Sequence, residues 1–171
     1  MMEYPKNEVA PARMNLVGIG YDVHRFAENR ALVLGGVTIP HTHGLDGHSD
    51  ADVLCHAIAD AILGAIGERD IGHHFPNIDP ECEGMSSLEI VRRAAELVAE
   101  QGGRLNNIDS TLIAEAPKIG PHLDAMKTNL ARVLALDPRR IGIKATTNER
   151  LGFLGRQEGI AAMAVASVEM P

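Results

Sequence analysis

The feature that most restricts the fold is an apolar stretch between Ser49 and Gly67, which contains no lysine or arginine. Its apolar residues recur at the spacing of one helix face, at Val53, Leu54, Ala57, Ile58, Ala61, Ile62 and Ala65. Ser49 with Asp52 three residues later resembles a capping box, and Gly67 is a suitable stop. The pattern predicts a helix that packs its apolar stripe on a sheet.

The other elements follow from shorter apolar runs and turn residues. We expect a strand over 16–23, a hairpin over 31–40 turning at Gly35-Gly36, a helix over 86–102, a strand over 105–115, a helix over 121–136 and strands over 141–147 and 160–168. The turn-rich segments 69–81 and 148–159 are expected to be loops. This order predicts an α+β fold, an α/β sandwich in which a mixed four-stranded sheet carries helices on one face, plus the small hairpin.

The length suits one domain, which we place at residues 15–171 after a disordered leader over 1–14. The net charge of −7 and an aromatic content of 3% disfavour binding to duplex or single-stranded nucleic acid. An acidic chain still binds a phosphorylated small molecule when metal ions and backbone N–H groups supply positive charge. Cys55 and Cys82 lack a paired spacing, so we expect reduced thiols in a cytoplasmic protein, without a membrane span.

Asp22 and His24 lie two residues apart in the first predicted strand, so their side chains share one face. Within the apolar helix, Asp52, His56 and Asp60 recur every four residues as a polar stripe. Aspartate and histidine are coordinating or acid–base residues rather than good helix formers, which favours a functional interpretation over a solvated helix face.

Zinc accepts imidazole and carboxylate ligands, and a catalytic zinc commonly has three protein ligands and one open position. Asp22, His24 and His56 would supply such a set. A polar strand end is the simpler alternative for the first two residues. Rival ligands by residue type are His41, His43, His73, His74 and His122.

Two further segments carry candidate phosphate contacts. Thr146-Thr147 stands at the end of a predicted strand, with Glu149 just beyond, so hydroxyl and N–H groups could hold phosphate oxygens while the carboxylate shares a Mg²⁺ ion. Lys118 precedes the predicted helix over 121–136 and could meet a phosphate. An ordinary polar loop and a surface lysine are the alternatives.

Several stretches together resemble the 2-C-methyl-D-erythritol 2,4-cyclodiphosphate synthase family. They are, in the family's order, "GIGYDVHRF", "LVLGGVTIP", "GLDGHSDADVLCHAIADAILGA", "RDIGHHFPNIDP", "AEAPKIGPH" and "IKATTNERLGFLGRQEGIAA". The resemblance extends from about residue 16 to residue 168. Each stretch is weak evidence by itself, whereas the ordered set is specific.

The resemblance implies an enzyme of the non-mevalonate isoprenoid pathway that acts on 4-diphosphocytidyl-2-C-methyl-D-erythritol 2-phosphate. The 2-phosphate would attack the β-phosphorus within the same molecule, releasing CMP and forming a cyclic diphosphate. The family further implies a homotrimer with one Zn²⁺ per subunit, Mg²⁺ or Mn²⁺ on the substrate phosphates, and active sites between subunits. An apolar cavity on the trimer axis, near Arg156 and Glu158, would accept an isoprenoid diphosphate.

Carried over by position, the resemblance implies that Asp22, His24 and His56 bind zinc, that Glu149 binds magnesium, and that His48 and Thr147 are catalytic. The implied substrate contacts are Asp22, His24, His48, Ser49, Asp70, Ile71, Gly72, Phe75, Pro76, Asn77, Ile78, Asp79, Ala114, Lys118, Ile119, Gly120, Thr146, Thr147, Asn148, Glu149, Phe153 and Arg156. Among them, 75–79 corresponds to a loop that closes over the methylerythritol part, and 114–120 to the cytidine pocket.

One position departs from the family pattern. Asn77 stands where relatives often have a second aspartate, so this loop position keeps hydrogen bonding and loses charge. Two other functions compete with the cyclase: a non-catalytic protein with a structural zinc, and a metal-dependent phosphohydrolase. Structural zinc sites usually have four ligands and are rich in cysteine, which favours an open site here.

Overall fold

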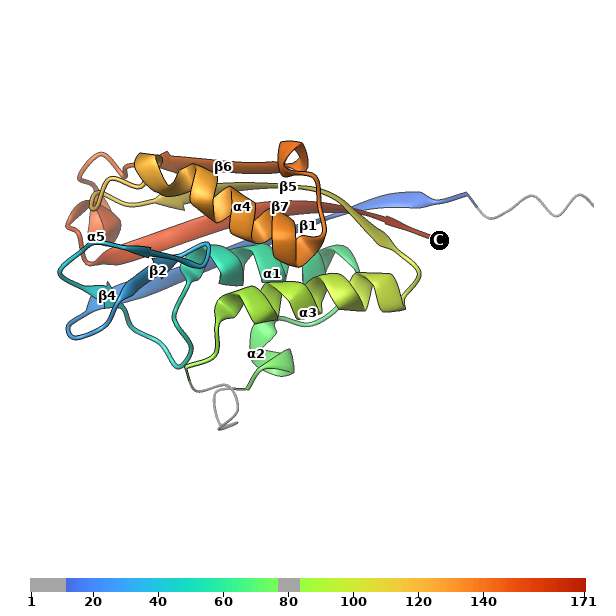
Figure 1. Cartoon of the computed structure of the whole chain (residues 1–171), viewed down its shortest axis with the longest axis horizontal. Coiled ribbons are helices and arrows are strands. Elements are labelled where there is room, and N and C mark those ends of the chain that lie inside the picture. Colours follow the sequence, from blue (N-terminus) through green and yellow to red (C-terminus); the bar gives the residue numbers. More distant parts are fainter. Residues whose placement is uncertain (1–11, 77–83) are drawn as a thin grey trace, which may run out of the picture.

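A computed structural model describes residues 12–76 and 84–171 (Figure 1). Its main sheet has the strand order β4-β1-β7-β5-β6. The strands are β1 (Met14–Ala27), β4 (Gly44–Leu45), β5 (Arg104–Ile113), β6 (Ile141–Thr146) and β7 (Gly159–Met170). β1 and β5 pair antiparallel with β7, and β5 pairs parallel with β6, which confirms a mixed sheet.

The sheet has five strands, so the expected count of four was wrong. The additional strand is β4, whose two residues pair with Phe26 and Ala27. Two residues are too few to give a periodic pattern in the sequence. The predicted hairpin is confirmed as a separate two-stranded sheet of β2 (Leu32–Leu34) and β3 (Val37–Ile39), turning at two glycines with positive φ.

The apolar helix is α1 (Val53–Ala65), and it lies directly against β1 and β7. The helix begins at Asp52 rather than Ser49, because the Asp52 carboxylate caps it by accepting from the N–H of Cys55 at 3.1 Å. Gly18 and Gly20 on β1 face α1 so closely that a Cβ on Gly20 would lie 2.0 Å from the carbonyl oxygen of Ala57. Glycine therefore sets the short distance between the strand and the helix.

The other two long helices are α3 (Ser87–Glu100) and α4 (Leu123–Leu134), preceded by the 3₁₀ helix η2 (Gly120–His122). α3 packs on α1 and α4, and α4 packs on β6. Short helices α2 (Ile71–His74) and α5 (Gly152–Gly155) lie in segments that were wrongly predicted to be loops throughout. A second 3₁₀ turn, η3 (Pro138–Arg140), leads into β6.

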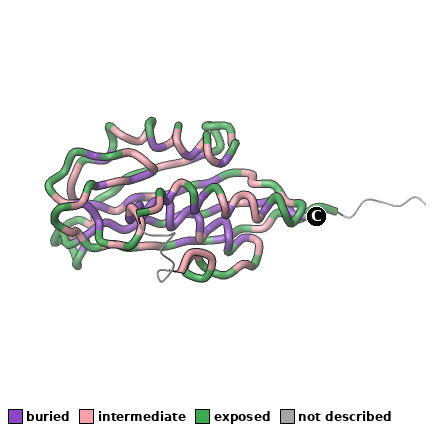
Figure 2. The backbone as a smooth tube through the Cα atoms, turned by 60° about the horizontal axis from the view of Figure 1, so that its bottom comes forward, coloured by how far each residue is buried: buried purple, intermediate pink, exposed green. Residues whose placement is uncertain are grey.

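The two faces of the sheet differ. The face under α1 is buried, and buried residues gather along the middle of the molecule (Figure 2). On the opposite face β1 and β7 expose apolar side chains, namely Val17, Ile19, Tyr21, Val23, Met163 and Val165. The three long helices thus cover one face, as predicted. None of the helices in the described part of the chain is long and apolar enough to cross a bilayer.

The segment expected as a leader overlaps the fold by one residue. Met14 already pairs with Met170, so β1 starts inside the segment 1–14. Residues 1–11 lie outside the described part of the chain, and the prediction of disorder there is not tested.

Candidate functional site

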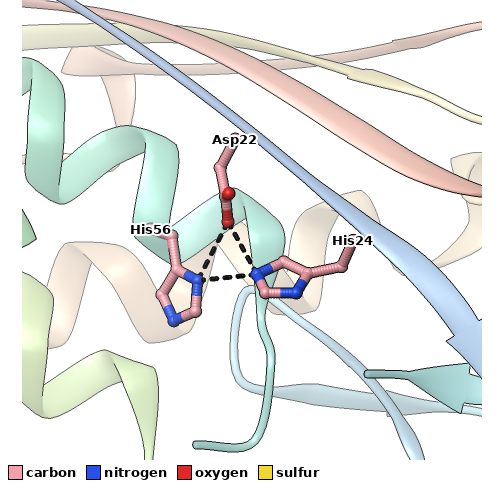
Figure 3. Close-up of side chains that lie close together, drawn as sticks. All are labelled: Asp22, His24 and His56. Atoms are coloured by element: carbon pink, nitrogen blue, oxygen red, sulfur yellow. Dashed lines mark hydrogen bonds and ion pairs between the residues drawn. The ribbon is translucent and has the colours of Figure 1, made fainter. Parts of the chain in front are cut away.

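Asp22, His24 and His56 converge on one point (Figure 3). Asp22 Oδ2 lies 2.9 Å from His24 Nε2 and 2.9 Å from His56 Nδ1, and the two imidazole nitrogens are 3.2 Å apart. The first two residues come from β1 and the third from α1. The sequence-based grouping of these three residues is therefore confirmed as a geometric cluster.

The local structure explains this convergence. Asp22 and His24 both point toward α1, because side chains two apart on a strand share a face. Gly20, one strand period earlier, allows α1 to approach β1, which brings His56 within reach of both. His56 is 6% exposed, whereas Asp22 and His24 are partly exposed, so the cluster is open on one side.

Hydrogen bonds orient the His24 ring and shift the pKa values of Asp22 and His24. His24 Nδ1 lies 2.5 Å from the carbonyl oxygen of Asp46, so Nδ1–H donates there and Nε2 faces Asp22. Burial would raise the pKa of the Asp22 carboxyl, but hydrogen bonds from His24 and His56 outweigh it and hold this pKa well below its usual value. Burial would lower the pKa of His24, but its bond to Asp22 raises that pKa above the usual imidazole value.

The donor set fits a divalent metal ion. A tetrahedral ion with bonds of 2.0–2.1 Å separates its ligand atoms by about 3.3 Å. The measured separations of 2.9–3.2 Å are close to that value. One carboxylate and two imidazoles without sulfur suit zinc and related borderline metals, and three protein ligands leave a position open for an exogenous oxygen.

Of the predicted polar stripe on α1, only His56 belongs to this cluster. Asp52 is fully buried and caps the helix, and its other oxygen accepts from the N–H of Gly36 at 2.7 Å. Asp60 accepts from the N–H of Ile71 at 2.8 Å and so anchors α2. The functional interpretation of these two aspartates as site groups was wrong, because the fold uses both to bind backbone.

The rival histidines lie elsewhere in the described structure. His41 and His43 pack around Phe26, with ring centroids 5.3 and 6.3 Å from it. His73 and His74 belong to α2, and His122 belongs to η2. Among the described residues, Asp22, His24 and His56 form a group whose ligand atoms all lie within 4.8 Å of one another.

A cavity of about 240 Å³ opens beside Asp22, His24 and His56, which form the candidate metal cluster, called the metal cluster below. Besides the three ligands, it is lined by Gly47, His48, Ser49, Ile71, Gly72, Phe75, Met85 and Ile90. Five of the predicted substrate contacts beyond the cluster are thus brought to it. Asp70 is exposed and caps α2 through the N–H of His73, and it does not line the cavity.

A second cavity, of about 360 Å³, lies at the end of β6. It is lined by Ala114, Glu115, Pro117, Lys118, Ile119, Gly120, Pro121, Ala145, Thr146 and Thr147. The structure therefore brings together the two segments that the sequence analysis connected with phosphate and cytidine. The hydroxyl of Thr147 donates to Glu149 Oε1 at 2.5 Å, so the predicted hydroxyl and carboxylate are neighbours.

Glu115 holds the loop that carries these groups. Its Oε1 accepts from the N–H groups of Asn148 and Arg150, both at 3.0 Å. Glu149 and Arg150 have φ of 51° and 63°, a left-handed conformation that is costly for residues other than glycine. Two N–H groups bound to one carboxylate oxygen offset that cost and fix the direction of the loop.

The remaining predicted contacts lie near other parts of the site or outside the residues that the structure describes. Phe153 lines a third cavity of about 420 Å³ together with His24, Arg25 and Glu158. Arg156 Nε donates to Glu158 at 2.5 Å beside it. Pro76 is half-buried after α2, and Asn77, Ile78 and Asp79 lie outside the described residues.

The first two cavities are far apart in one chain. Asp22 pairs with Ala162, Ala162 with Leu112, and Leu112 with Ala145, so one row of the sheet connects the metal cluster to the end of β6. Three inter-strand spacings separate β1 from β6, which is roughly 14 Å. The two cavities share no lining residue.

Comparison with known proteins identifies the family. The model of the YgbB family matches residues 15–169. The chain belongs to the YgbB family. A relative from Akkermansia muciniphila, named 2-C-methyl-D-erythritol 2,4-cyclodiphosphate synthase, is 63% identical over 91% of this chain and 93% of its own length. A protein of the same name from Synechocystis is 58% identical over 88% of this chain and 93% of its own length.

Solved structures agree with this assignment. A 2C-methyl-D-erythritol-2,4-cyclodiphosphate synthase in its CDP-bound form is 38% identical, covers 89% of this YgbB-family chain and 99% of its own, and has a TM-score of 0.82. The bifunctional IspDF from Campylobacter jejuni is 45% identical with a TM-score of 0.90. The match covers 94% of this chain and 44% of that longer protein.

Sequence reasoning missed the residues that support the site of this YgbB-family chain. Arg30 donates to the carbonyl oxygens of Gly47 and Ser49, at 2.5 and 2.6 Å, and so holds the loop beside the metal cluster. Ser87 and Glu115 likewise contact site groups far away in sequence. A buried serine, or a glutamate in a loop, gives no periodic or spacing signal, so no local pattern could have found them.

Proposed function

We propose that this chain converts 4-diphosphocytidyl-2-C-methyl-D-erythritol 2-phosphate to 2-C-methyl-D-erythritol 2,4-cyclodiphosphate and CMP. An oxygen of the 2-phosphate forms a bond to the β-phosphorus. The bond from that phosphorus to the oxygen shared with CMP breaks, and CMP leaves with the electron pair. The proposal depends chiefly on one observation, a three-ligand cluster with an open side in a family whose curated relatives carry the name of this synthase.

Asp22, His24 and His56 would hold a zinc ion, and Glu149 would share a magnesium or manganese ion with the diphosphate. Bound there, the two metals would supply Lewis-acid stabilisation of phosphate charge. The chain's own charge of −7 would repel a substrate with several phosphates, and bound cations would offset that repulsion. Because the nucleophile belongs to the substrate, the protein residues act by position and by charge.

The residues around the metal cluster are assigned to the reacting phosphates. His48 and Ser49 line the first cavity next to the cluster, where an imidazole and a hydroxyl can donate to a phosphate oxygen. Thr147 is the second catalytic group, and its hydroxyl would stabilise charge that develops as CMP leaves. Asp70 and Gly72 would meet the ribose and the groups next to it, with Ile71 between them as a further substrate contact. The segment of Phe75, Pro76, Asn77, Ile78 and Asp79 would close over the methylerythritol part.

The cavity at the end of β6 is assigned to cytidine. Ala114, Ile119 and Gly120 would offer backbone groups to the base, and Lys118 would meet a phosphate. Thr146, Asn148 and Glu149 would complete the diphosphate site. The support for this assignment is the lining of that cavity and the CDP-bound structure of a related synthase.

The complete site would be shared between subunits of a homotrimer. The metal cluster and the cytidine cavity lie roughly 14 Å apart along one sheet, measured in strand spacings, and have no lining residue in common. A neighbouring subunit would bring its own cytidine cavity to this metal cluster. The open face of the sheet, where Val17 and Ile19 are 66% and 67% exposed, offers an apolar surface for such assembly.

The same arrangement would place Arg156 and Glu158 near the trimer axis, while Phe153 and Arg156 would be further substrate contacts. Arg156 would then be available to the diphosphate of an isoprenoid ligand in an axial cavity. The support is the exposed apolar residues of β1 and β7 and the position of Arg156 in the chain, just before β7 begins. This ligand is a product class of the pathway rather than the substrate.

The decisive experiment follows the products by phosphorus NMR. Incubation of the purified full chain with the substrate and Mg²⁺ is expected to give the cyclic diphosphate and CMP in equal amounts. Linear hydrolysis products would instead identify a phosphohydrolase. Recovery of unchanged substrate with a zinc-loaded protein would favour the structural-zinc alternative. Light scattering of the same sample measures the subunit number.

A further inference from the structure

Ser87 and Asp50 lie directly behind the metal ligand His56. Ser87 is the first residue of α3 and is fully buried, and its Oγ lies 2.9 Å from His56 Nε2. The same hydroxyl lies 2.5 Å from Asp50 Oδ1, and the Ser87 N–H donates to Asp50 Oδ2 at 3.1 Å. One carboxylate therefore holds both polar groups of this serine.

We propose that Asp50 and Ser87 are positioning residues that keep the His56 proton on Nε2 and leave Nδ1 free for the metal ion. The inference rests on the proposed function, since it assumes a metal held by Asp22, His24 and His56. It extends the site to two residues that do not touch the metal or the substrate.

The donors and acceptors of Asp50, Ser87 and His56 determine the direction of the hydrogen bonds between them. An ionised carboxylate only accepts, so the hydroxyl proton of Ser87 is directed to Asp50. The oxygen of Ser87 then has only lone pairs to offer His56, and Nε2 must carry a proton to use them. Neutral imidazole has one proton, so Nδ1 keeps its lone pair, and this atom faces Asp22 and His24.

The other tautomer of His56 shows why it matters that the proton stays on Nε2. With its proton on Nδ1, His56 could donate to Asp22 at 2.9 Å, and the metal would have to displace that proton. Ser49 does not decide between the states, because its hydroxyl, 3.3 Å from Nε2, can either donate to that nitrogen or accept from it. His24 is fixed in an equivalent way by the carbonyl of Asp46, but through its opposite nitrogen.

The test measures metal affinity in the full chain without substrate. Zinc is titrated against a chelator of known affinity in the wild type, Ser87→Ala and Asp50→Asn. We expect each variant to bind zinc about 10- to 100-fold more weakly, the usual effect of losing a partner behind a metal ligand. Ser110→Ala is the matched control, because Ser110 is also a buried serine but donates to Gly142 in the sheet.

A second measurement, by NMR, detects the proton on His56 Nε2. In the zinc-loaded wild type, the Nε2–H of His56 should give a slowly exchanging ¹⁵N–¹H signal, which Ser87→Ala should lose to exchange with water. Affinities within about twofold of the wild type in both variants, with the signal retained, would overturn the proposal. A lower melting temperature without a change in affinity would also overturn it, since that is the signature of a structural bond. None of these readouts depends on the cyclisation, so failure of the proposed function would be recognised separately.

Discussion

The two halves of the candidate site are built in different ways. The metal cluster joins β1 to α1, two elements packed so closely that glycine is required between them, and its third ligand is buried. The group of Thr146, Thr147 and Glu149 lies on an exposed strand end and a loop in left-handed conformation. The first half is held by the core and the second by one carboxylate, that of Glu115.

This difference indicates a division of labour. Metal ligands must keep their separation to within a few tenths of an ångström, and only packed elements supply that precision. Groups that meet a substrate entering from solvent have to be accessible, and loops supply that. We expect substitutions in the first half to change metal content and substitutions in the second half to change turnover while the metal stays bound.

The largest expected effect comes from His56→Ala. Loss of a ligand should abolish zinc binding and lower the turnover by on the order of 10³-fold or more, since several kcal/mol of charge stabilisation disappear. Metal analysis together with the NMR assay measures both. His122→Ala, in η2, is the matched control and should keep full metal content. A His56→Ala protein with a full complement of zinc would remove His56 from the ligand set.

Next in size is Thr147→Val, which removes a hydroxyl and keeps the shape. We expect the turnover to fall by roughly 100-fold, in the range found when one donor to transition-state charge is lost. Zinc content should not change. Thr38→Val, at an exposed position of strand β3, is the comparison variant. If Thr147→Val loses zinc instead, the two halves are not independent.

A smaller effect is expected for Glu115→Ala. The variant removes the carboxylate that accepts from the N–H groups of Asn148 and Arg150. A hydrogen bond to a charged group contributes about 1.5–3 kcal/mol to stability. Hydrogen exchange of these two amides should become about 10- to 100-fold faster, with zinc affinity unchanged. Glu89→Ala on the exposed face of α3 serves as the control. Unchanged exchange at both amides would show that something else holds the loop.

The most gradual effect is a pH dependence confined to the metal half. The pKa of His24 is raised because the bond to Asp22 outweighs the effect of burial, and the metal needs the neutral imidazole. As the pH falls through that raised pKa, a proton occupies the ligand atom, so zinc affinity should fall by about tenfold per pH unit. Chelator titrations between about pH 8 and pH 5 measure this. A flat affinity over that range would contradict the raised pKa.

Much of the fold could be predicted from local patterns, and the errors have local causes. Ser49 and Asp52 are both good cap residues, so the sequence did not distinguish them. The fold selects Asp52 because its carboxylate also accepts from Gly36 of the hairpin, while the Ser49 hydroxyl accepts from Ala51. The four-residue helices α2 and α5 are too short to show a period.

The site residues were predictable where they follow the period of a strand or a helix. Asp22 and His24 follow the period of a strand, and His56 lies in a polar stripe at helical spacing, so each was visible in the sequence. Ser87 and Glu115 act through contacts that span 31 and 33 positions, between loops and helix ends without any period. Such contacts form only in the completed tertiary structure, so no local sequence pattern reveals them.

The glycine contact between β1 and α1 has a consequence for which ion the cluster accepts. Because Gly20 lies against the backbone of Ala57, the distance from strand to helix would limit the radius of an ion held by Asp22, His24 and His56. A small ion with bonds near 2.0–2.1 Å fits the present opening, whereas calcium prefers bonds of 2.3–2.6 Å and more oxygen ligands. Discrimination between metals would thus be encoded in a residue that has no side chain and lies outside the coordination sphere.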